Sequence, residues 1–184
     1  VSALLKLGFS QVRETAEGAA LVTKEYCSLI EKGEMDNIIT TTCPGVISLV
    51  EKHYPMLIPY LAPVISPMLA HGKLIKEILG EDVKVVFIGP CVAKKVEAEL
   101  DPRTRGAIDA VIEFNELEKW LEEEGIDLME CEEKPFANPD PMVNQLYSVN
   151  RGVSRSIKAT GRMGTYLDIS VTGVANCREL LHSM

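Results

Sequence analysis

Two segments of this chain share one pattern: a short run of apolar or β-branched residues, then a cysteine, then a helical pattern. In the first, residues 37–41 (NIITT) precede Cys43 and Pro44, and in the second, residues 83–88 (VKVVFI) precede Cys91. Such runs are typical of buried parallel strands, and a proline fits the first turn of a helix, where its missing N–H costs nothing. Open α/β sheets bind ligands at strand ends, and helix N-termini favour thiolates. The pattern therefore predicts that the two thiols converge on one crevice.

The rest of the chain alternates between helical and strand-like patterns. Periodicity and end signals predict helices at 1–7, 19–31, 44–53, 67–79, 93–100, 116–124, 153–159 and 175–182. Further strands are expected at 11–13, 109–113 and 167–171. Ser66 is expected to cap the helix at 67–79, Asn115 and Glu118 form a capping-box-like start, and residues 127–140 form an acidic surface excursion. This order predicts an α/β fold with mostly parallel sheets flanked by helices.

Charge and cysteine content argue against several classes of function. A net charge of −8 and a pI near 5.0 disfavour nucleic acid and anionic membranes as partners. No apolar run approaches the roughly 18 residues of a membrane span, and no secretory signal is visible. The five cysteines are irregularly spaced and include no C-x-x-C pair. This favours reduced thiols in a cytoplasmic protein over a disulfide framework or the usual zinc and thioredoxin sites.

Both ends of the chain lie inside helical patterns. The chain begins at Val1 without an initiator methionine, and it ends at Met184 with no Gly or Pro terminator nearby. With 46% hydrophobic side chains among 184 residues, it can bury a sizeable core, as one domain or two small intertwined ones. We expect a piece of a longer protein.

The residues alone leave two interpretations of Cys43 and Cys91 open. Free cysteines often pack as small buried hydrophobes. The alternative is a pair of ligands, which the flanking prolines and the following Lys94 and Lys95 favour, because a lysine there can pair with anionic ligands on a metal. Two thiolates are too few for a cubane iron–sulfur cluster, which needs about four. The remaining ligands would have to come from elsewhere.

The other cysteines and the histidines do not repeat this context. Cys27 lies in a helical stretch, Cys131 in an acidic loop and Cys177 on a helix, and we interpret all three as structural. The three histidines are scattered on helices and form no i, i+4 pair, which argues against a metal role. The acidic residues between 122 and 133 are interpreted as a solvated face.

Four segments resemble the motifs of a known family. They are 41–45 (TTCPG), 51–57 (EKHYPML), 65–68 (ISPM) with Gly72, and 89–98 (GPCVAKKVEA). They are similar to T-S-C-C-P-G-W, E-x-Y-Y-P-E-L, K-S-P-Q-x-x-x-G and M-P-C-x-x-K-K-x-E-A of the iron-only ([FeFe]) hydrogenases, in the catalytic domain of the large subunit. The resemblance covers nearly the whole chain. It implies the iron-only hydrogenase fold, in which two α/β lobes intertwine, here truncated.

The resemblance also implies a cofactor site. By position, Cys43 and Cys91 would be two of four thiolate ligands of the H-cluster, a [4Fe–4S] cubane bridged to a di-iron centre that carries CO and cyanide. Lys94 would donate to a cyanide ligand. The family's other two ligands lie in an E-x-x-x-C-x-x-x-C segment, so residues 1–184 correspond to a C-terminal-type domain of the large subunit, truncated before them. This fragment alone is predicted to hold an incomplete cluster or none, and to be inactive.

Several positions depart from the family pattern, some at proton-transfer positions and others in the pocket lining. The family's proton-relaying cysteine corresponds to Thr42, whose hydroxyl is a poor acid–base group at neutral pH. The relay serine corresponds to Ser66, and the two relay glutamates fall on Tyr26 and Leu29, with Glu25 the nearest carboxylate. Pocket positions that are Met, Gln and Gly-rich in the family are occupied here by Gly89, Met68 and residues 149–152 (VNRG).

These departures favour low turnover. The leading hypothesis is a hydrogenase-like protein from the cytoplasm of an anaerobe, which performs reversible hydrogen oxidation and proton reduction, or hydrogen or redox sensing. A ferredoxin or ferredoxin-like domain is the implied electron partner, and a downstream signalling module is compatible with a sensor. The alternatives are a non-catalytic iron–sulfur cluster carrier or assembly-type relative, an ordinary hydrogenase with fast turnover, and a thiol-redox enzyme using a Cys43–Cys91 disulfide.

Overall fold

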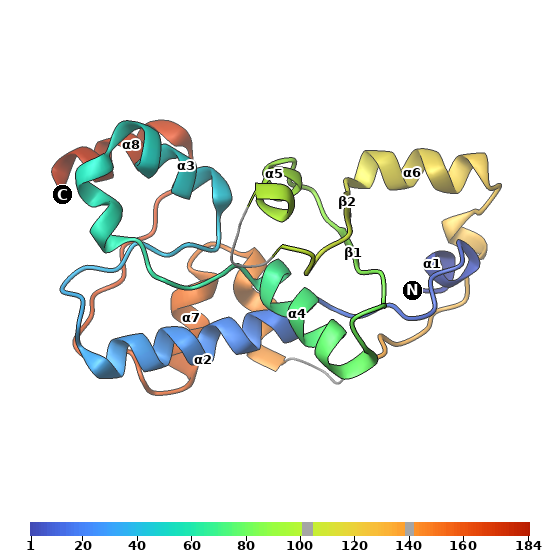
Figure 1. Cartoon of the computed structure of the whole chain (residues 1–184), viewed down its shortest axis with the longest axis horizontal. Coiled ribbons are helices and arrows are strands. Elements are labelled where there is room, and N and C mark those ends of the chain that lie inside the picture. Colours follow the sequence, from blue (N-terminus) through green and yellow to red (C-terminus); the bar gives the residue numbers. More distant parts are fainter. Residues whose placement is uncertain (101–104, 139–141) are drawn as a thin grey trace.

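The structure is a computed structural model that describes residues 1–100, 105–138 and 142–184. Most of its elements are helices, and its two short strands lie near the middle of the chain with one helix between them (Figure 1). The α-helices are α1 (Ser2–Lys6), α2 (Ala16–Lys32), α3 (Pro44–His53), α4 (Pro67–Leu79), α5 (Ala93–Leu100), α6 (Phe114–Glu123), α7 (Gly152–Ala159) and α8 (Val174–Ser183). The 3-10 helices are η1 (Pro55–Tyr60), η3 (Leu128–Glu130) and η4 (Met142–Ser148), and the strands are β1 (Val86–Ile88) and β2 (Ala110–Ile112).

The sheet of the described residues consists of β1 and β2, which run parallel. Val86 pairs with Ala110, Phe87 with Val111 and Ile88 with Ile112. The connection between them contains α5, as a parallel pair requires a crossover. The strands predicted at 83–88 and 109–113 are therefore confirmed, each shortened to three residues.

The strand predicted at 37–41 is reduced to an isolated parallel bridge between Ile39 and Leu61. Ile39 N–H donates to the main-chain oxygen of Tyr60 at 2.7 Å, and Ala62 N–H donates to that of Ile39 at 2.9 Å. The ladder ends there because the N–H of Thr41 bonds to a tyrosine side chain instead of a neighbouring strand. The first cysteine therefore follows an extended segment rather than a full strand.

The strands predicted at 11–13 and 167–171 are not formed in the described structure. In the second, Leu167 and Ile169 are 92% and 72% exposed. Between them, Asp168 accepts hydrogen bonds from Ser154 and Lys158 of α7. The polar side chain therefore binds the protein while its apolar neighbours face solvent, which is the inverse of a half-buried strand.

The starts of α3 and α4 follow the sequence signals. Pro44 and Pro67 occupy the first helical positions. Ser66 is the N-cap of α4, and its Oγ accepts a hydrogen bond from the Leu69 N–H at 3.5 Å. A proline at the first position and a serine cap specify both starts locally.

Helix α6 begins two residues earlier than predicted. Its N-cap is Glu113 rather than Asn115, and a reciprocal capping box links Glu113 with Glu116. The Glu113 N–H donates to Glu116 Oε2 at 2.8 Å. The acidic excursion at 127–140 contains η3, and its residues 139–140 lie outside the described residues.

Helices α2 and α4 pack against each other at the centre of the fold (Figure 1). A Cβ at Gly18 would lie 2.3 Å from the main-chain oxygen of Pro67 and 2.6 Å from His71 Cβ, so this approach requires glycine. The largest buried apolar cluster joins α2 to α4, to α7 and to the segment before α4; it comprises Val22, Tyr26, Cys27, Leu29, Ala62, Val64, Ala70 and Ile157. No helix in the described ranges is both long and apolar enough to cross a membrane.

Candidate functional site

Cys43 occupies the N-cap position of α3 and is exposed. Its main-chain oxygen accepts hydrogen bonds from the N–H groups of Val46 at 3.1 Å and Ile47 at 3.2 Å. The thiol therefore lies at the positive end of a helix, as the sequence pattern predicted.

Cys91 lies between the end of β1 and the start of α5 and is half-buried. The Gly89 N–H before it donates to the main-chain oxygen of Ile112 at 3.0 Å, which fixes the loop to the strand β2. Helices α3 and α5, each preceded by one of the two cysteines, contact each other.

Lys94 joins the two cysteine segments. Its Nζ donates to the main-chain oxygen of Thr42 at 3.2 Å and to Glu97 Oε2 at 2.7 Å. The side chains of Lys94 and Glu97 are 13% and 7% exposed, so they form a nearly buried ion pair. Because Thr42 precedes Cys43 directly and Lys94 follows Cys91 within one turn, this contact brings the two thiol-bearing helix starts to one place.

Helix α2 also binds the loop that precedes Cys43. The N–H of Thr41 donates to Tyr26 Oη at 2.9 Å, and the Thr41 hydroxyl donates to the main-chain oxygen of Val64 at 2.6 Å. Both side chains are buried, and burial raises the pKa of Tyr26, so its phenol stays protonated. The loop before Cys43 is therefore fixed on two sides, by α2 and by α5.

The whole chain, residues 1–184, matches the family described as the iron only hydrogenase large subunit, C-terminal domain. The chain belongs to this family. Its structure is similar to apo [FeFe]-hydrogenase HydA1 from Chlamydomonas reinhardtii, solved as a cysteine-to-histidine variant. The TM-score is 0.74 and the sequence identity 30%, over 94% of this chain and 49% of that one.

Two curated relatives represent different functions. Iron hydrogenase 1 from Clostridium pasteurianum is 30% identical over 174 residues, which are 87% of this chain and 29% of that protein. The cytosolic Fe-S cluster assembly factor nar1 from Emericella nidulans is 29% identical over 160 residues, which are 71% of this chain and 27% of that protein. This hydrogenase-family chain thus spans less than a third of the length of these two relatives.

The residues at the proton-relay positions of the family pattern are partly or fully buried in this chain. Thr42 is half-buried, and its main-chain oxygen binds Lys94. Ser66 is buried and caps α4. Tyr26 and Leu29, at the relay glutamate positions, are buried residues of α2 and belong to the large apolar cluster. Glu25, the nearest carboxylate, is exposed.

The three other cysteines lie in different surroundings. Cys27 is buried within α2, with its thiol 3.3 Å from Thr160 Oγ1. The Cys131 thiol donates to the main-chain oxygen of Asp127 at 3.3 Å, and Cys177 lies in the first turn of α8. The structural interpretation of the three cysteines stays a prediction.

The donor set fits half of a cubane site. Thiolates are the ligands that iron–sulfur clusters prefer, and Cys43 and Cys91 supply two of the four or so that a cubane needs. Within the described ranges, no group of three or more His, Cys, Asp and Glu side chains is placed to hold a metal ion. The candidate cluster site is therefore Cys43, Cys91 and the adjacent Lys94, with two ligand positions left to other groups.

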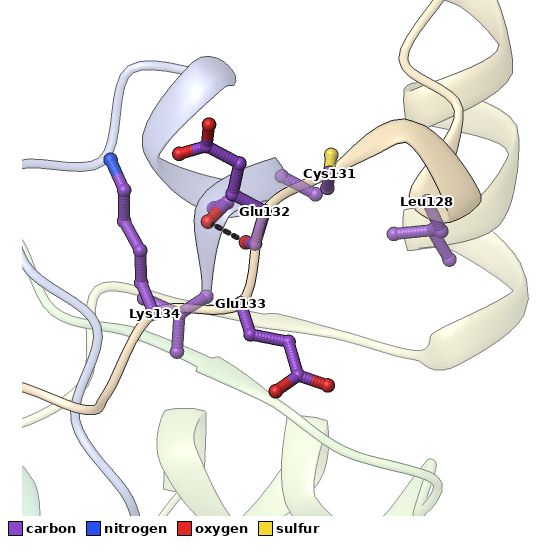
Figure 2. Close-up of a pocket in the computed structure, with 8 residues that line it drawn as sticks. Leu128, Cys131, Glu132, Glu133 and Lys134 are labelled. Atoms are coloured by element: carbon purple, nitrogen blue, oxygen red, sulfur yellow. Dashed lines mark hydrogen bonds between the residues drawn. The ribbon is translucent and has the colours of Figure 1, made fainter.

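The pocket in Figure 2 lies elsewhere, between α1 and the segment that follows η3. It has a volume of about 320 Å³ and is lined by Val1, Ser2, Ala3, Leu128, Cys131, Glu132, Glu133 and Lys134. Ser2 Oγ donates to the main-chain oxygen of Glu132 across it. Neither Cys43 nor Cys91 lines this pocket, so it is separate from the candidate cluster site.

The sequence analysis did not assign a function to two residues that support the site, Glu97 and Thr41. Glu97 pairs with Lys94 at a spacing of three residues, which is a recognisable ion-pair spacing on a helix and could have identified it. Thr41 binds Tyr26 from 15 residues away, and no local pattern signals that contact.

Proposed function

We propose that this chain holds an iron–sulfur cluster through Cys43 and Cys91 for storage or assembly, without fast hydrogen turnover. The observation that carries the proposal is the 3.2 Å hydrogen bond from Lys94 to Thr42, because it holds the two thiol-bearing segments together. A bound cluster would supply one-electron chemistry, and the protein would supply two thiolates and a nearby ammonium group.

The proton-transfer positions argue against fast turnover. The position that the resemblance assigns to a relaying thiol is Thr42, and a threonine hydroxyl does not ionise near neutral pH. Tyr26, at a relay glutamate position, is a buried phenol whose pKa is raised by burial. Neither group can pass protons as a carboxylate or thiol would.

The similarity to the assembly factor nar1 supports the same proposal. That relative is described as cytosolic and as a factor in Fe-S cluster assembly, and it matches 71% of this chain. A cytosolic carrier or assembly role needs bound cluster and partner proteins, but no proton path. We therefore place this chain in the cytosol as well.

A hydrogenase or hydrogen sensor of low turnover is the second candidate. It is favoured by Lys94, which lies where the resemblance expects a donor to cyanide, and by the similarity to iron hydrogenase 1 over 87% of this chain. This candidate, unlike the first, requires a di-iron centre and an electron partner such as a ferredoxin-like domain.

Anaerobic reconstitution tests the proposal. The reduced protein is incubated with ferrous iron, sulfide and a small thiol that can complete the ligand set, and bound iron and visible absorption are then measured. We expect the unsubstituted chain and Cys131→Ser to take up iron equally, and Cys43→Ser and Cys91→Ser to lose most of it. Equal uptake by all four proteins would contradict the proposal.

Infrared spectroscopy separates the two candidates. After incubation with a di-iron precursor that carries CO and cyanide, the first candidate predicts a cluster spectrum without CO or cyanide bands. Such bands in the washed protein, lost in Cys91→Ser, would favour the second candidate instead.

A further inference from the structure

Tyr26 of α2 and Thr41, which lies two residues before Cys43, form a closed set of buried hydrogen bonds. Tyr26 Oη accepts from the Thr41 N–H at 2.9 Å and lies 3.3 Å from Thr41 Oγ1. Thr41 Oγ1 lies 2.6 Å from the main-chain oxygen of Val64, to which it donates. The Tyr26 O–H is then left to donate to Thr41 Oγ1, so each proton in the set has an acceptor.

The burial of these groups makes the contacts costly to lose. Tyr26 is 1% exposed and Thr41 is 4% exposed. A buried N–H or hydroxyl without a partner costs more than an exposed one, because water cannot replace the lost bond. The set therefore fixes the backbone at Thr41 relative to α2 and to the segment that leads into α4.

The same backbone is also fixed one residue later. The main-chain oxygen of Thr42 accepts from Lys94 Nζ, and Cys43 then begins α3 as its N-cap. The three consecutive residues Thr41, Thr42 and Cys43 are thus attached to α2, to α5 and to α3 in turn. A shift of α2 would move the thiol relative to Cys91.

We propose that Tyr26 and Thr41 are positioning residues, a latch that fixes the direction in which the backbone presents Cys43. The role of the latch in cluster retention rests on the proposed function, whereas the latch itself does not. The resemblance assigns a relay glutamate to the position of Tyr26, and in this chain we assign that position an anchoring role instead.

Four variants isolate the latch. Tyr26→Phe removes only the phenol oxygen, and Thr41→Val removes only the hydroxyl, at nearly constant volume. Thr41→Ser keeps the hydroxyl and is the conservative rescue. Tyr147→Phe is the control, because Tyr147 is a half-buried tyrosine that also bonds to α2, with its Oη 2.9 Å from Thr23 Oγ1, but it lies outside the latch.

The first readout is hydrogen exchange of the Thr41 amide in the protein without cluster. We expect exchange about tenfold faster in Tyr26→Phe, because the amide loses its buried acceptor, and unchanged in Tyr147→Phe. Equal exchange in both tyrosine variants and the unsubstituted chain would overturn the latch.

The second readout is the rate at which reconstituted protein releases iron to a chelator. Release is expected to be about fivefold faster in Tyr26→Phe and Thr41→Val, and unchanged in Thr41→Ser and Tyr147→Phe. Faster exchange with unchanged release would overturn the role in cluster retention. If the unsubstituted chain takes up no cluster, the proposed function fails, whereas the exchange measurement still decides the latch.

Discussion

The Nζ of Lys94 lies 3.2 Å from the main-chain oxygen of Thr42, although 52 residues separate them in the chain. This contact joins the loop before α3 to the loop before α5, and each loop carries one cysteine. It couples the stability of the fold to the geometry of the candidate cluster site.

Replacing Lys94 should destabilise the protein more than replacing its neighbour. Lys94→Met leaves the Glu97 carboxylate nearly buried without its cation and the Thr42 oxygen without its donor, so we expect a loss of about 2–3 kcal/mol in the free energy of unfolding. Lys95→Met is the control, because Lys95 pairs with Glu113 and Glu116 in a more exposed place and should cost less. Urea denaturation measures both, and equal losses would contradict the burial argument.

The double variant Lys94→Met with Glu97→Gln sharpens this prediction. Removing the charge of Glu97 as well eliminates the unpaired buried carboxylate, so part of the lost stability should return. A double variant that is less stable than Lys94→Met would show that the ion pair is not what the single substitution disrupts.

Protonation of His71 should destabilise the fold. His71 Nε2 lies 3.0 Å from Glu17 Oε2, and burial lowers the pKa of His71 below its usual 6.5 despite the carboxylate. The unfolded chain therefore binds a proton more readily than the folded one, so this contribution is complete above the unfolded pKa and decreases as the pH falls below it. Urea midpoints between about pH 7.5 and pH 5 should decline less steeply in His71→Gln, and an unchanged slope would contradict the assignment.

Asp109 should contribute stability that is lost only in acid. Burial alone would raise the pKa of Asp109, but the Val85 N–H and the Lys76 and Lys84 ammonium groups hold it at about 2, against 3.8 for a free carboxyl. Stability is thus present above the unfolded pKa and is lost as the pH falls from 3.8 through about 2. After allowance for solvent screening, we expect the free energy of unfolding to fall by about 1 kcal/mol across this pH range. Urea denaturation at several pH values should show this loss in the unsubstituted chain and in the exposed control Asp82→Asn. The loss should be absent in Asp109→Asn.

A methyl group at Gly18 should separate α2 from α4. A Cβ there would meet the main-chain oxygen of Pro67 at 2.3 Å, so Gly18→Ala should cost about 1–3 kcal/mol. Gly45→Ala is the matched helical control, because its Cβ would meet only Cys43 Sγ at 3.7 Å and it should be neutral or slightly stabilising. Thermal unfolding of the two variants compares them, and similar melting temperatures would contradict the close approach.

Local signals made much of the fold predictable. Pro44 and Pro67 mark the first turns of α3 and α4, and Ser66 is the predicted cap. These features act within four residues, so the sequence alone reveals them. The helix start at Glu113 was missed because its cap is a glutamate, which is less usual than the predicted Asn115.

Strands were less predictable because they depend on partners. Residues 167–171 alternate in hydrophobicity as a strand would, but Asp168 and Ser170 bind the side chains of Ser154 and Asn150, and the apolar residues face solvent. Within the part of the chain that the structure describes, residues 37–41 pair with another segment only at Ile39, because Thr41 binds Tyr26 instead. The side of such a segment that becomes buried depends on the neighbouring elements, so the local sequence does not determine it.

The two candidate cysteines follow from the sequence pattern, and their role as ligands stays a prediction. The repeated order of extended segment, cysteine and helix singles out Cys43 and Cys91, and Lys94 links the two loops that carry them. The spacing of Glu97 from Lys94 could have identified that ion pair, whereas the contact between Tyr26 and Thr41 becomes evident only in three dimensions.

The most direct test of the account is whether Cys43 and Cys91 can be bridged within one chain. The reduced protein would be treated anaerobically with a short bifunctional maleimide, and the bridged peptides identified by mass spectrometry. Because the Lys94–Thr42 contact holds the two loops together, the account predicts a Cys43–Cys91 bridge as the main intramolecular product, reduced in Lys94→Met. If both thiols are modified singly and no bridge between them forms, they do not share a site, and the proposed cluster-holding function is wrong.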